Sequence, residues 1–150
     1  MVTPLHKNLV NIELGGQKNK ALVDTGSSVT AISTKFLNQT YFANRTLSRD
    51  GILKIFSADG TSHNVLGRID LSFRSGPKVF RNKFLVIPDL DHTIVLGMDF
   101  LRLNKASLDL DKQTLYLNDN KVKVNLLQSN SQLARVRSYD TRQTMVYSTY

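Results

Sequence analysis

Short runs of β-branched and aromatic residues, interrupted by turn residues roughly every 8 to 12 positions, limit most strongly what this 150-residue chain can form. The runs 8–14 and 18–23 flank Gly15-Gly16, which supplies the positive φ angles of a tight hairpin. The runs 52–56 and 63–73 flank a second hairpin signal at Asp59-Gly60. Further strands are expected at 29–33, 78–87, 93–96, 106–110, 114–117 and 121–126, and short helices at 34–37, extending to 42 at most, and at 98–103. The pattern predicts an all-β closed barrel or sandwich of about nine short strands with one or two short helices.

The composition indicates one folded domain followed by a polar segment. Apolar residues make up 41% of the chain, which is enough to bury a core over residues 1–127. Residues 128–150 are rich in Ser, Gln, Arg and Tyr and have no sustained apolar period, so we expect a flexible tail or linker there. No apolar run approaches the roughly 20 residues that cross a bilayer, and no secretory signal is visible. We therefore expect no membrane partner and a cytoplasmic location.

Several classes of chemistry are disfavoured by the residue counts. The chain has no cysteine, and its three histidines, at positions 6, 63 and 92, lack the spacing of metal ligands, so we expect no metal and no cofactor. The net charge is +8, but the basic residues are scattered and form no continuous patch. A solvated basic surface is the favoured interpretation, and nucleic acid is not expected as a specific partner. Weak association with RNA or with an acidic partner is the alternative.

The tripeptide Asp24-Thr25-Gly26 directly follows the apolar run 21–23 and occurs once. In an arbitrary chain such a tripeptide most often forms a turn, with Gly at a positive φ angle. Here the preceding strand is apolar, and a carboxylate beside a core is costly unless it has partners. Two carboxylates about 3 Å apart share one proton, so together they can activate a water and protonate a leaving group. Because the chain supplies one such aspartate, the second Asp24 would come from a second copy, and a homodimer is expected.

Two blocks of sequence carry a family resemblance. Residues 8–28, with the Gly15-Gly16-Gln17 hairpin before Asp-Thr-Gly, and residues 94–101, reading Ile-Val-Leu-Gly-Met-Asp-Phe-Leu, resemble the aspartic proteases of retroviruses and LTR retroelements. The second block is similar to the style common in Ty3/gypsy-type elements. The resemblance covers about residues 5–126 and implies the retropepsin fold, a closed β-barrel that acts as a homodimer. The source would be a retroelement polyprotein or a host gene derived from one.

The resemblance implies roles for the residues of the first block. Asp24 of each subunit would bind and activate the water, Thr25 would hydrogen-bond across the pair of aspartates, and Gly26 would contribute a main-chain contact to substrate. Ser27 stands where retroviral members often have alanine, and its hydroxyl could donate to the outer oxygen of the Asp24 carboxylate. Such a donor would favour the ionised form of the pair.

The hairpin 52–67 would correspond to the flap that closes over substrate, although an ordinary surface hairpin is the alternative. Leu22, Thr93 and Val95 match positions that line subsites in the family, and Ile55 and Phe56 are weaker candidates on the flap; each could also belong to the core. The residues expected to contact substrate are Leu22, Ser27, Ser28, Ile55, Phe56, Ala58, Asp59, Gly60, Thr93 and Val95.

The chain departs from the family in its dimer contacts. Retroviral members usually pair an acidic residue with an arginine to brace the dimer, but Ser28 and Met98 occupy those positions here. Lys7 occupies the place of a further basic interface residue, so support for the dimer would come from elsewhere. Asp99 would cap the short helix or reach Arg102, and capping is favoured. Whether residues 121–126 join an interface sheet is open.

These features predict an aspartic endopeptidase that cleaves polyprotein peptide bonds between mainly apolar residues, with a cytoplasmic setting that includes virus-like particles. The alternative is a catalytically silent module that kept the fold for dimerisation or peptide binding.

Overall fold

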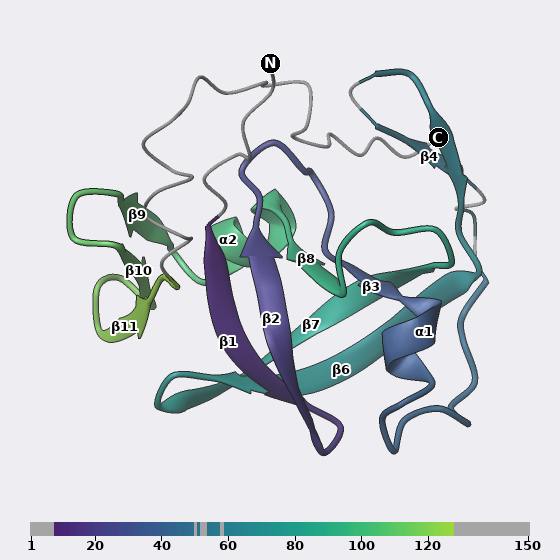
Figure 1. Ribbon diagram of the computed structural model, residues 1–150, viewed down its shortest axis with the longest axis horizontal. Helices are drawn as coiled ribbons and strands as arrows, with labels where there is room; N and C mark the ends of the chain where they lie inside the picture. Colours follow the sequence, from purple (N-terminus) through teal and green to yellow (C-terminus); the bar gives the residue numbers. More distant parts are fainter. Residues whose placement is uncertain (1–7, 50, 52–53, 58, 128–150) are drawn as a thin grey trace.

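A computed structural model describes residues 8–49, 51, 54–57 and 59–127 (Figure 1). The expected tail at 128–150 lies outside the described residues, and so do Lys7 and Ala58. The regular structure of the described residues consists of short strands and two short helices. Six strands close into a barrel, which confirms the predicted all-β closed architecture.

The barrel begins with the predicted N-terminal hairpin. Strands β1 (Leu9–Leu14) and β2 (Gln17–Val23) pair antiparallel, from Leu9 opposite Leu22 to Leu14 opposite Gln17. Gly15 and Gly16 between them have φ angles of 58° and 81°, which glycine adopts without steric cost. Alternate residues of β1 point into the barrel, since Val10, Ile12 and Leu14 are buried.

The barrel has the strand order β1-β2-β8-β3-β7-β6 and closes where β6 returns to β1. Its other strands are β3 (Ala31–Ser33), β6 (Gly67–Ser75), β7 (Lys78–Ile87) and β8 (Ile94–Leu96). Strand β8 lies between β2, to which it is parallel, and β3, to which it is antiparallel, so Val95 faces both Leu22 and Ala31 in the register. All three residues of β8 are buried, as expected of a central strand covered on both faces. Because β8 crosses over to pair in parallel with β2, the C-terminal ends of these two strands lie side by side.

Each helix starts next to a barrel strand. Helix α1 (Thr34–Leu37) begins after Ser33, whose side chain accepts a hydrogen bond from the Phe36 amide at 3.1 Å, an ordinary N-cap contact. It ends at Leu37, the shorter of the two expected lengths. Helix α2 (Met98–Leu103) follows Gly97 and has the predicted bounds.

The C-terminal strands form a small sheet inside the subunit. Strands β9 (Ser107–Asp109), β10 (Thr114–Leu117) and β11 (Val122–Asn125) pair antiparallel with β10 in the middle. Their buried residues join the main core, and the Leu127 amide donates to the Leu9 carbonyl at 2.8 Å. Strand β11 thus pairs with β10 of its own subunit, and a role of 121–126 between subunits stays a prediction.

One predicted strand is wrong as a single element. The run 63–73 splits into β5 (Ser62–Asn64), which pairs with β4 (Lys54–Phe56) as a separate hairpin, and β6, which starts at Gly67. The break occurs because Gly67 lies against an earlier loop. A Cβ at this position would lie 2.8 Å from the Ser48 carbonyl oxygen and 2.8 Å from the Leu47 Cβ. The contact depends on residues far away in the sequence, so local periodicity gave no sign of it.

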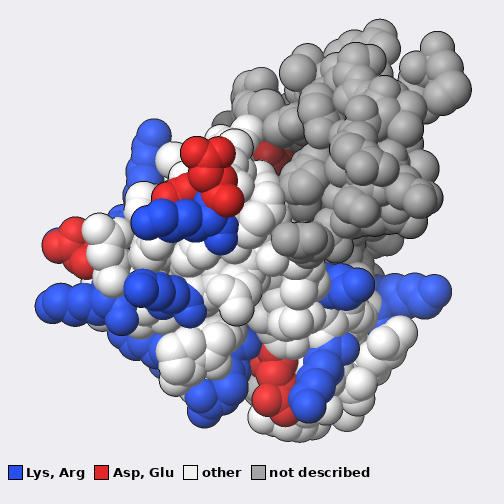
Figure 2. All heavy atoms as spheres, turned by 60° about the vertical axis from the view of Figure 1, so that its left-hand side comes forward, with Lys and Arg blue, Asp and Glu red and all other residues white. Residues whose placement is uncertain are grey.

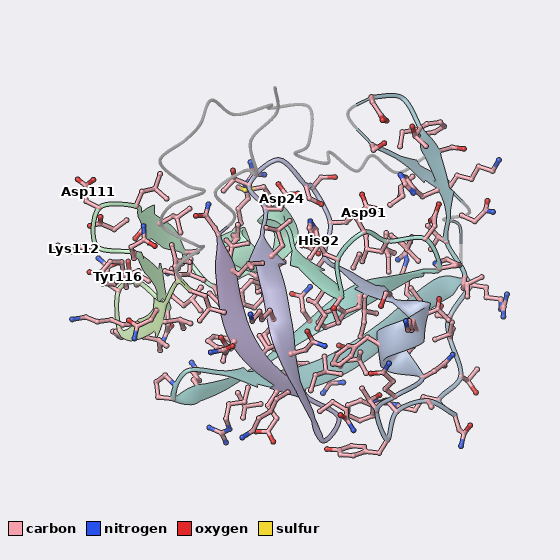
Figure 3. The ribbon with its side chains drawn as sticks, viewed as in Figure 1. Asp24, Asp91, His92, Asp111, Lys112 and Tyr116 are labelled. Carbon is pink, nitrogen blue, oxygen red and sulfur yellow. The ribbon has the colours of Figure 1, made fainter. Side chains whose placement is uncertain are left out.

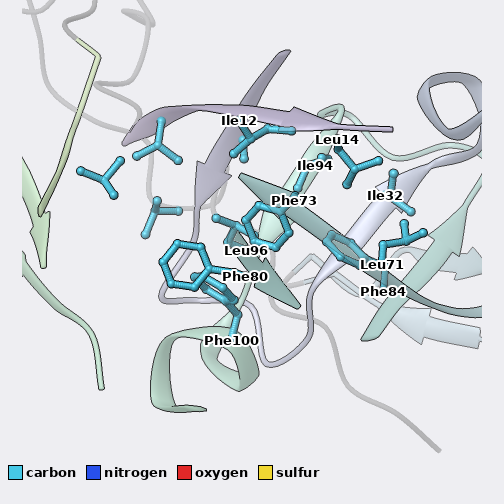
Figure 4. Packing of buried hydrophobic residues seen from close by; sticks show 14 of the residues in the cluster. Ile12, Leu14, Ile32, Leu71, Phe73, Phe80, Phe84, Ile94, Leu96 and Phe100 are labelled. Atoms are coloured by element: carbon cyan, nitrogen blue, oxygen red, sulfur yellow. The ribbon is translucent and has the colours of Figure 1, made fainter. Parts of the chain in front are cut away.

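The buried side chains form two clusters. The larger fills the barrel and includes aromatic contacts between Phe73, Phe80 and Phe100 with ring centroids 5.5 to 5.9 Å apart (Figure 4). The smaller cluster joins the separate hairpin to the barrel and consists of Ala31, Ile55, Val65, Leu85, Ile87 and Val95. The hairpin is therefore attached at its base by apolar contacts.

Among the described residues, no helix combines the length and the apolar character that crossing a membrane requires.

Candidate active site

Asp24 lies at the end of β2, away from the Gly15-Gly16 turn (Figure 3). Its backbone amide donates to the Leu96 carbonyl at 3.0 Å, which continues the pairing of β2 with β8 by one residue. The residue is 4% exposed, and its Oδ1 accepts from the Gly26 amide at 2.9 Å. The end of β2, where Ala21 and Val23 are buried, thus places a buried carboxylate at one end of the barrel.

The loop 24–30, which we call the Asp24 loop, is held against the turn at Gly97. The Met98 amide donates to the Ser27 carbonyl at 2.7 Å, and the Gly97 amide donates to the Thr30 hydroxyl at 3.0 Å. The two backbones lie so close that a Cβ on Gly97 would be 2.1 Å from the Val29 carbonyl oxygen. The two sequence blocks that carried the resemblance are therefore in direct contact.

The residues after Asp24 differ in exposure. Thr25 and Ser28 are exposed, Gly26 is half-buried, and Ser27 is fully buried. Thr25 is thus an exposed residue directly beside the buried Asp24.

The expected contact from the Ser27 hydroxyl to Asp24 is replaced by a local one. The Ser27 hydroxyl donates to the Val29 carbonyl at 2.7 Å and accepts from the Val29 amide at 3.3 Å. A serine hydroxyl has one proton, so it does not also donate to the carboxylate in this arrangement. Ser27 stabilises the Asp24 loop instead.

The hairpin of β4 and β5, which we call the flap, has hydrogen bonds around Asp59 at its tip. The Asp59 Oδ1 accepts from the Ser57 hydroxyl at 2.6 Å and from the Thr61 amide at 2.9 Å, while the Ser57 amide donates to the Thr61 carbonyl. The Ser57 hydroxyl, and after it the Thr61 amide, lower the pKa of Asp59 from 3.8 to about 2. Gly60 is exposed at the tip with a φ of 87°.

The base of the flap is bound to the barrel. Ile55 is fully buried in the smaller cluster, where Val95 is 1% exposed. Both were candidates for a substrate-facing wall as well as for the core, and in this subunit both are core residues. The His63 Nδ1 lies 3.2 Å from the Asp89 Oδ2, which links β5 to the loop after β7.

Other wall candidates keep exposed surface. Leu22, Phe56 and Thr93 are half-buried. Leu22 packs at the edge of the smaller cluster together with Val29 and Leu90, two partly buried apolar residues that the sequence interpretation missed. Val29 lies between Ser28 and Thr30, and Leu90 lies between Asp89 and Asp91. An apolar residue between two polar ones in a loop is the sequence signal that could have identified both.

The described residues hold no group of three or more histidine or acidic side chains that could bind a metal ion. Figure 2 shows one face of the molecule, where Lys and Arg side chains lie in several places with Asp and Glu among them. Basic and acidic side chains are thus mixed on this face, as the scattered sequence positions of the basic residues predicted.

The closed barrel, the crossover of β8 and the aspartate loop against a glycine turn define a retropepsin-like aspartyl protease domain. The family model described as gag-polyprotein putative aspartyl protease matches residues 10–103, and the chain belongs to this family.

A solved structure and curated proteins agree with this assignment. The retroviral protease-like domain of Ddi1 from Leishmania major superimposes with a TM-score of 0.67 at 20% identity, covering 83% of this chain and 96% of that one, which supports the fold. DNA damage-inducible protein 1 of Kluyveromyces lactis is 31% identical over 110 residues, covering 73% of this chain and 26% of that protein. Its counterpart from Chaetomium globosum is 30% identical over 115 residues, covering 75% of this chain and 25% of that protein. The chain therefore spans about a quarter of the length of these curated relatives.

Proposed function

We propose that the chain is an aspartic endopeptidase in which two copies each contribute one Asp24 carboxylate to a shared site. The observation that supports this most directly is the setting of Asp24, which is 4% exposed at a strand end and is followed by an exposed Thr25. One subunit supplies a single positioned carboxylate, which is half of an acid-base pair. A two-fold axis beside this loop would bring the second one opposite.

The chemistry follows from the two carboxylates sharing one proton. The ionised carboxylate takes a proton from a bound water while the water oxygen attacks the peptide carbonyl carbon, and the protonated carboxyl donates its proton to the carbonyl oxygen. The tetrahedral intermediate then collapses as the carboxyl that took the proton of the water donates it to the amide nitrogen, the other carboxylate takes a hydroxyl proton back, and the C–N bond breaks. No covalent bond forms between enzyme and substrate. Thr25 would hydrogen-bond across the pair, and Gly26 would contact the substrate backbone.

The substrate class that fits best is an extended peptide with apolar side chains near the cleaved bond. Leu22, Val29 and Leu90 keep partial exposure at the edge of the smaller cluster, and apolar contact there would bind such side chains. The flap, with Asp59 and Gly60 at its tip, would cover the peptide and exclude water. Ser28, Phe56 and Thr93 are further candidate contacts, while Ala58 lies outside the described residues.

The biological setting belongs to the proposal as well. We assign the protease domain to residues 1–127. The family name points to polyprotein processing, whereas the curated relatives carry the name of a DNA damage-inducible protein. A retroelement origin, a cytoplasmic location and processing inside virus-like particles are predictions of the first setting.

Cleavage of peptides by purified protein, with and without Asp24→Asn, tests the proposal. A quenched-fluorescent library of extended peptides is incubated from acidic to neutral pH, with and without pepstatin. Asp24→Asn is expected to lower turnover by at least about a hundredfold, because both proton-transfer groups of the shared site, one from each subunit, are lost. Asp70→Asn is the matched control, since Asp70 pairs with Arg81 on the exposed barrel surface. Retained turnover in Asp24→Asn, or no turnover in the unmodified dimer, would contradict the proposal; the second result would favour a silent binding module.

A further inference from the structure

The buried hydroxyl of Thr30 connects the Asp24 loop to the Gly97 turn. Thr30 is 1% exposed, and its Oγ1 accepts from the Gly97 amide at 3.0 Å. The same hydroxyl donates to the Asp99 Oδ1 at 2.6 Å. A threonine hydroxyl has one proton, so its donation to Asp99 leaves an oxygen lone pair directed at Gly97.

The carboxylate of Asp99 is held from more than one side. Its Oδ1 also accepts from the Phe100 amide at 2.7 Å, and its Oδ2 lies 3.4 Å from the Asn82 Nδ2. Asn82 belongs to β7, so the carboxylate connects the Asp24 loop, helix α2 and a barrel strand. The distance of 2.6 Å from Thr30 is in the range of charge-assisted O–H···O⁻ bonds, which are the stronger kind.

Of the two roles expected for Asp99, capping of α2 is met only in part, because its Oδ1 accepts from the first-turn amide of Phe100. Gly97, not Asp99, is the N-cap residue of α2, and no ion pair joins Asp99 to Arg102 in the described part of the chain. The carboxylate is used to orient a buried hydroxyl. Ser28 and Met98 replace the charged pair of retroviral members, and Thr30 provides a side-chain link between the Asp24 loop and the Gly97 turn.

We propose that Thr30 and Asp99 are positioning residues that fix the Asp24 carboxylate for proton transfer. The inference rests on the proposed protease function. Asp99 orients the Thr30 hydroxyl, the hydroxyl holds the Gly97 amide, and the residue before Gly97 accepts the hydrogen bond of the Asp24 amide. A shift of the Gly97 turn therefore moves Asp24 relative to its partner aspartate. Catalysis is sensitive to such shifts, because about 1 Å of misplacement can cost a hundredfold in rate.

Thr40 offers a matched control for Thr30. It is also buried, and its hydroxyl also accepts from a backbone amide, that of Phe42 at 3.1 Å, while it donates to a backbone carbonyl, that of Leu37 at 2.7 Å, where Thr30 donates to a carboxylate. Thr40 lies beside Gly15, at the other end of the β1–β2 hairpin from Asp24. The substitution Thr40→Val thus also removes one donated and one accepted hydrogen bond of a buried hydroxyl, far from the site.

The first experiment compares kcat, KM and the pH profile of peptide cleavage in Thr30→Val, Thr30→Ser and Thr40→Val, each verified as a folded dimer by sedimentation. Thr30→Val is expected to lower kcat at least about tenfold with little change in KM, and to shift the acidic limb of the profile. Thr30→Ser keeps the hydroxyl and should restore kcat to within about threefold, and Thr40→Val should keep the kcat and pH profile of the unmodified protein. Unchanged kcat and pH profile in Thr30→Val, or an equal loss in Thr40→Val, would overturn the proposal.

The pair Asp99→Asn and Asp99→Ala gives a second test that holds even if Thr30→Val does not fold. Asparagine keeps a side-chain oxygen that accepts from Thr30, whereas alanine does not. The asparagine variant should therefore retain several times more kcat than the alanine variant, and equal kcat in the two would overturn the role of Asp99.

A readout independent of turnover separates this inference from the proposed function. Hydrogen exchange of the Gly97 amide should be slow in the unmodified protein and in Thr30→Ser, and fast in Thr30→Val. If no peptide is cleaved while the Gly97 amide shows this pattern, the protease function fails and the link between Thr30 and Gly97 stands. A Gly97 amide that exchanges equally fast in all three proteins would refute the link itself.

Discussion

At the scale of single residues, the absence of a side chain at Gly97 allows the two sequence blocks to meet. The φ of Gly97 is −95°, which other residues adopt easily, so conformational freedom is not why glycine stands there. The reason is close packing, because a Cβ would lie 2.1 Å from the Val29 carbonyl oxygen and 2.5 Å from its carbon. Both atoms belong to the backbone and cannot rotate away.

Gly97→Ala is therefore expected to push the Asp24 loop away from the end of β8. The overpacking should lower the free energy of unfolding by at least about 1–3 kcal/mol, measured by urea denaturation. Peptide cleavage should fall by a larger factor than the loss of folded protein explains, because the loop carries Asp24. An alanine variant with unchanged stability and unchanged turnover would contradict this account of the contact.

At the scale of elements, the strands were largely predictable and their partners were not. Apolar runs, turn residues and helix-capping residues predicted β1, β2, β7 and both helices nearly to the residue, because these signals are local. The split between β5 and β6 was missed, since it depends on the contact of Gly67 with residues 47–48. The order of strands around the barrel likewise depends on long-range pairing.

In the candidate site, too, local features were predictable and features that depend on the folded surroundings were not. The position of Asp24 at a strand end followed from the apolar run before it. The core location of Ile55 and Val95 could not be separated from a substrate-facing one, because an apolar residue in a short strand suits either surroundings. The sequence predicted Asp24 as the acceptor of the Ser27 hydroxyl, whereas the structure shows the Val29 carbonyl. The choice between these two acceptors depends on the geometry of the loop.

The flap turn leads to a prediction about Asp59. The hydrogen bonds from Ser57 and Thr61 favour its ionised form, so the pKa should be about 2 in the folded protein. Because the pKa of Asp59 is lower in the folded chain than its ordinary value of 3.8, the ionised carboxylate stabilises the turn at pH values above 3.8. This stabilisation is lost as the pH falls toward 2. Carboxyl ¹³C titration by NMR should therefore find Asp59 ionised in mild acid. Ser57→Ala should move the pKa up toward 3.8, and a pKa near 3.8 in the unmodified protein would contradict the described turn.

At the scale of the whole molecule, one chain has its own core, whereas the proposed function needs the Asp24 carboxylate of a second copy. The larger cluster fills the barrel without help from a second copy, so Asp24→Asn is expected to fold and to pair as the unmodified chain does. Mixing the two kinds of subunit then changes the composition of the sites without changing the assembly. Each mixed dimer would hold one carboxylate and one amide, and a single carboxylate cannot perform both proton transfers efficiently.

The most direct test of the shared site is turnover measured while Asp24→Asn subunits replace unmodified subunits at constant total protein, after subunit exchange is complete. If two Asp24 side chains form one site, turnover falls with the square of the unmodified fraction, to about a quarter at an equal mixture. A fall in direct proportion, to about half at an equal mixture, would mean that each subunit works alone and would contradict the account.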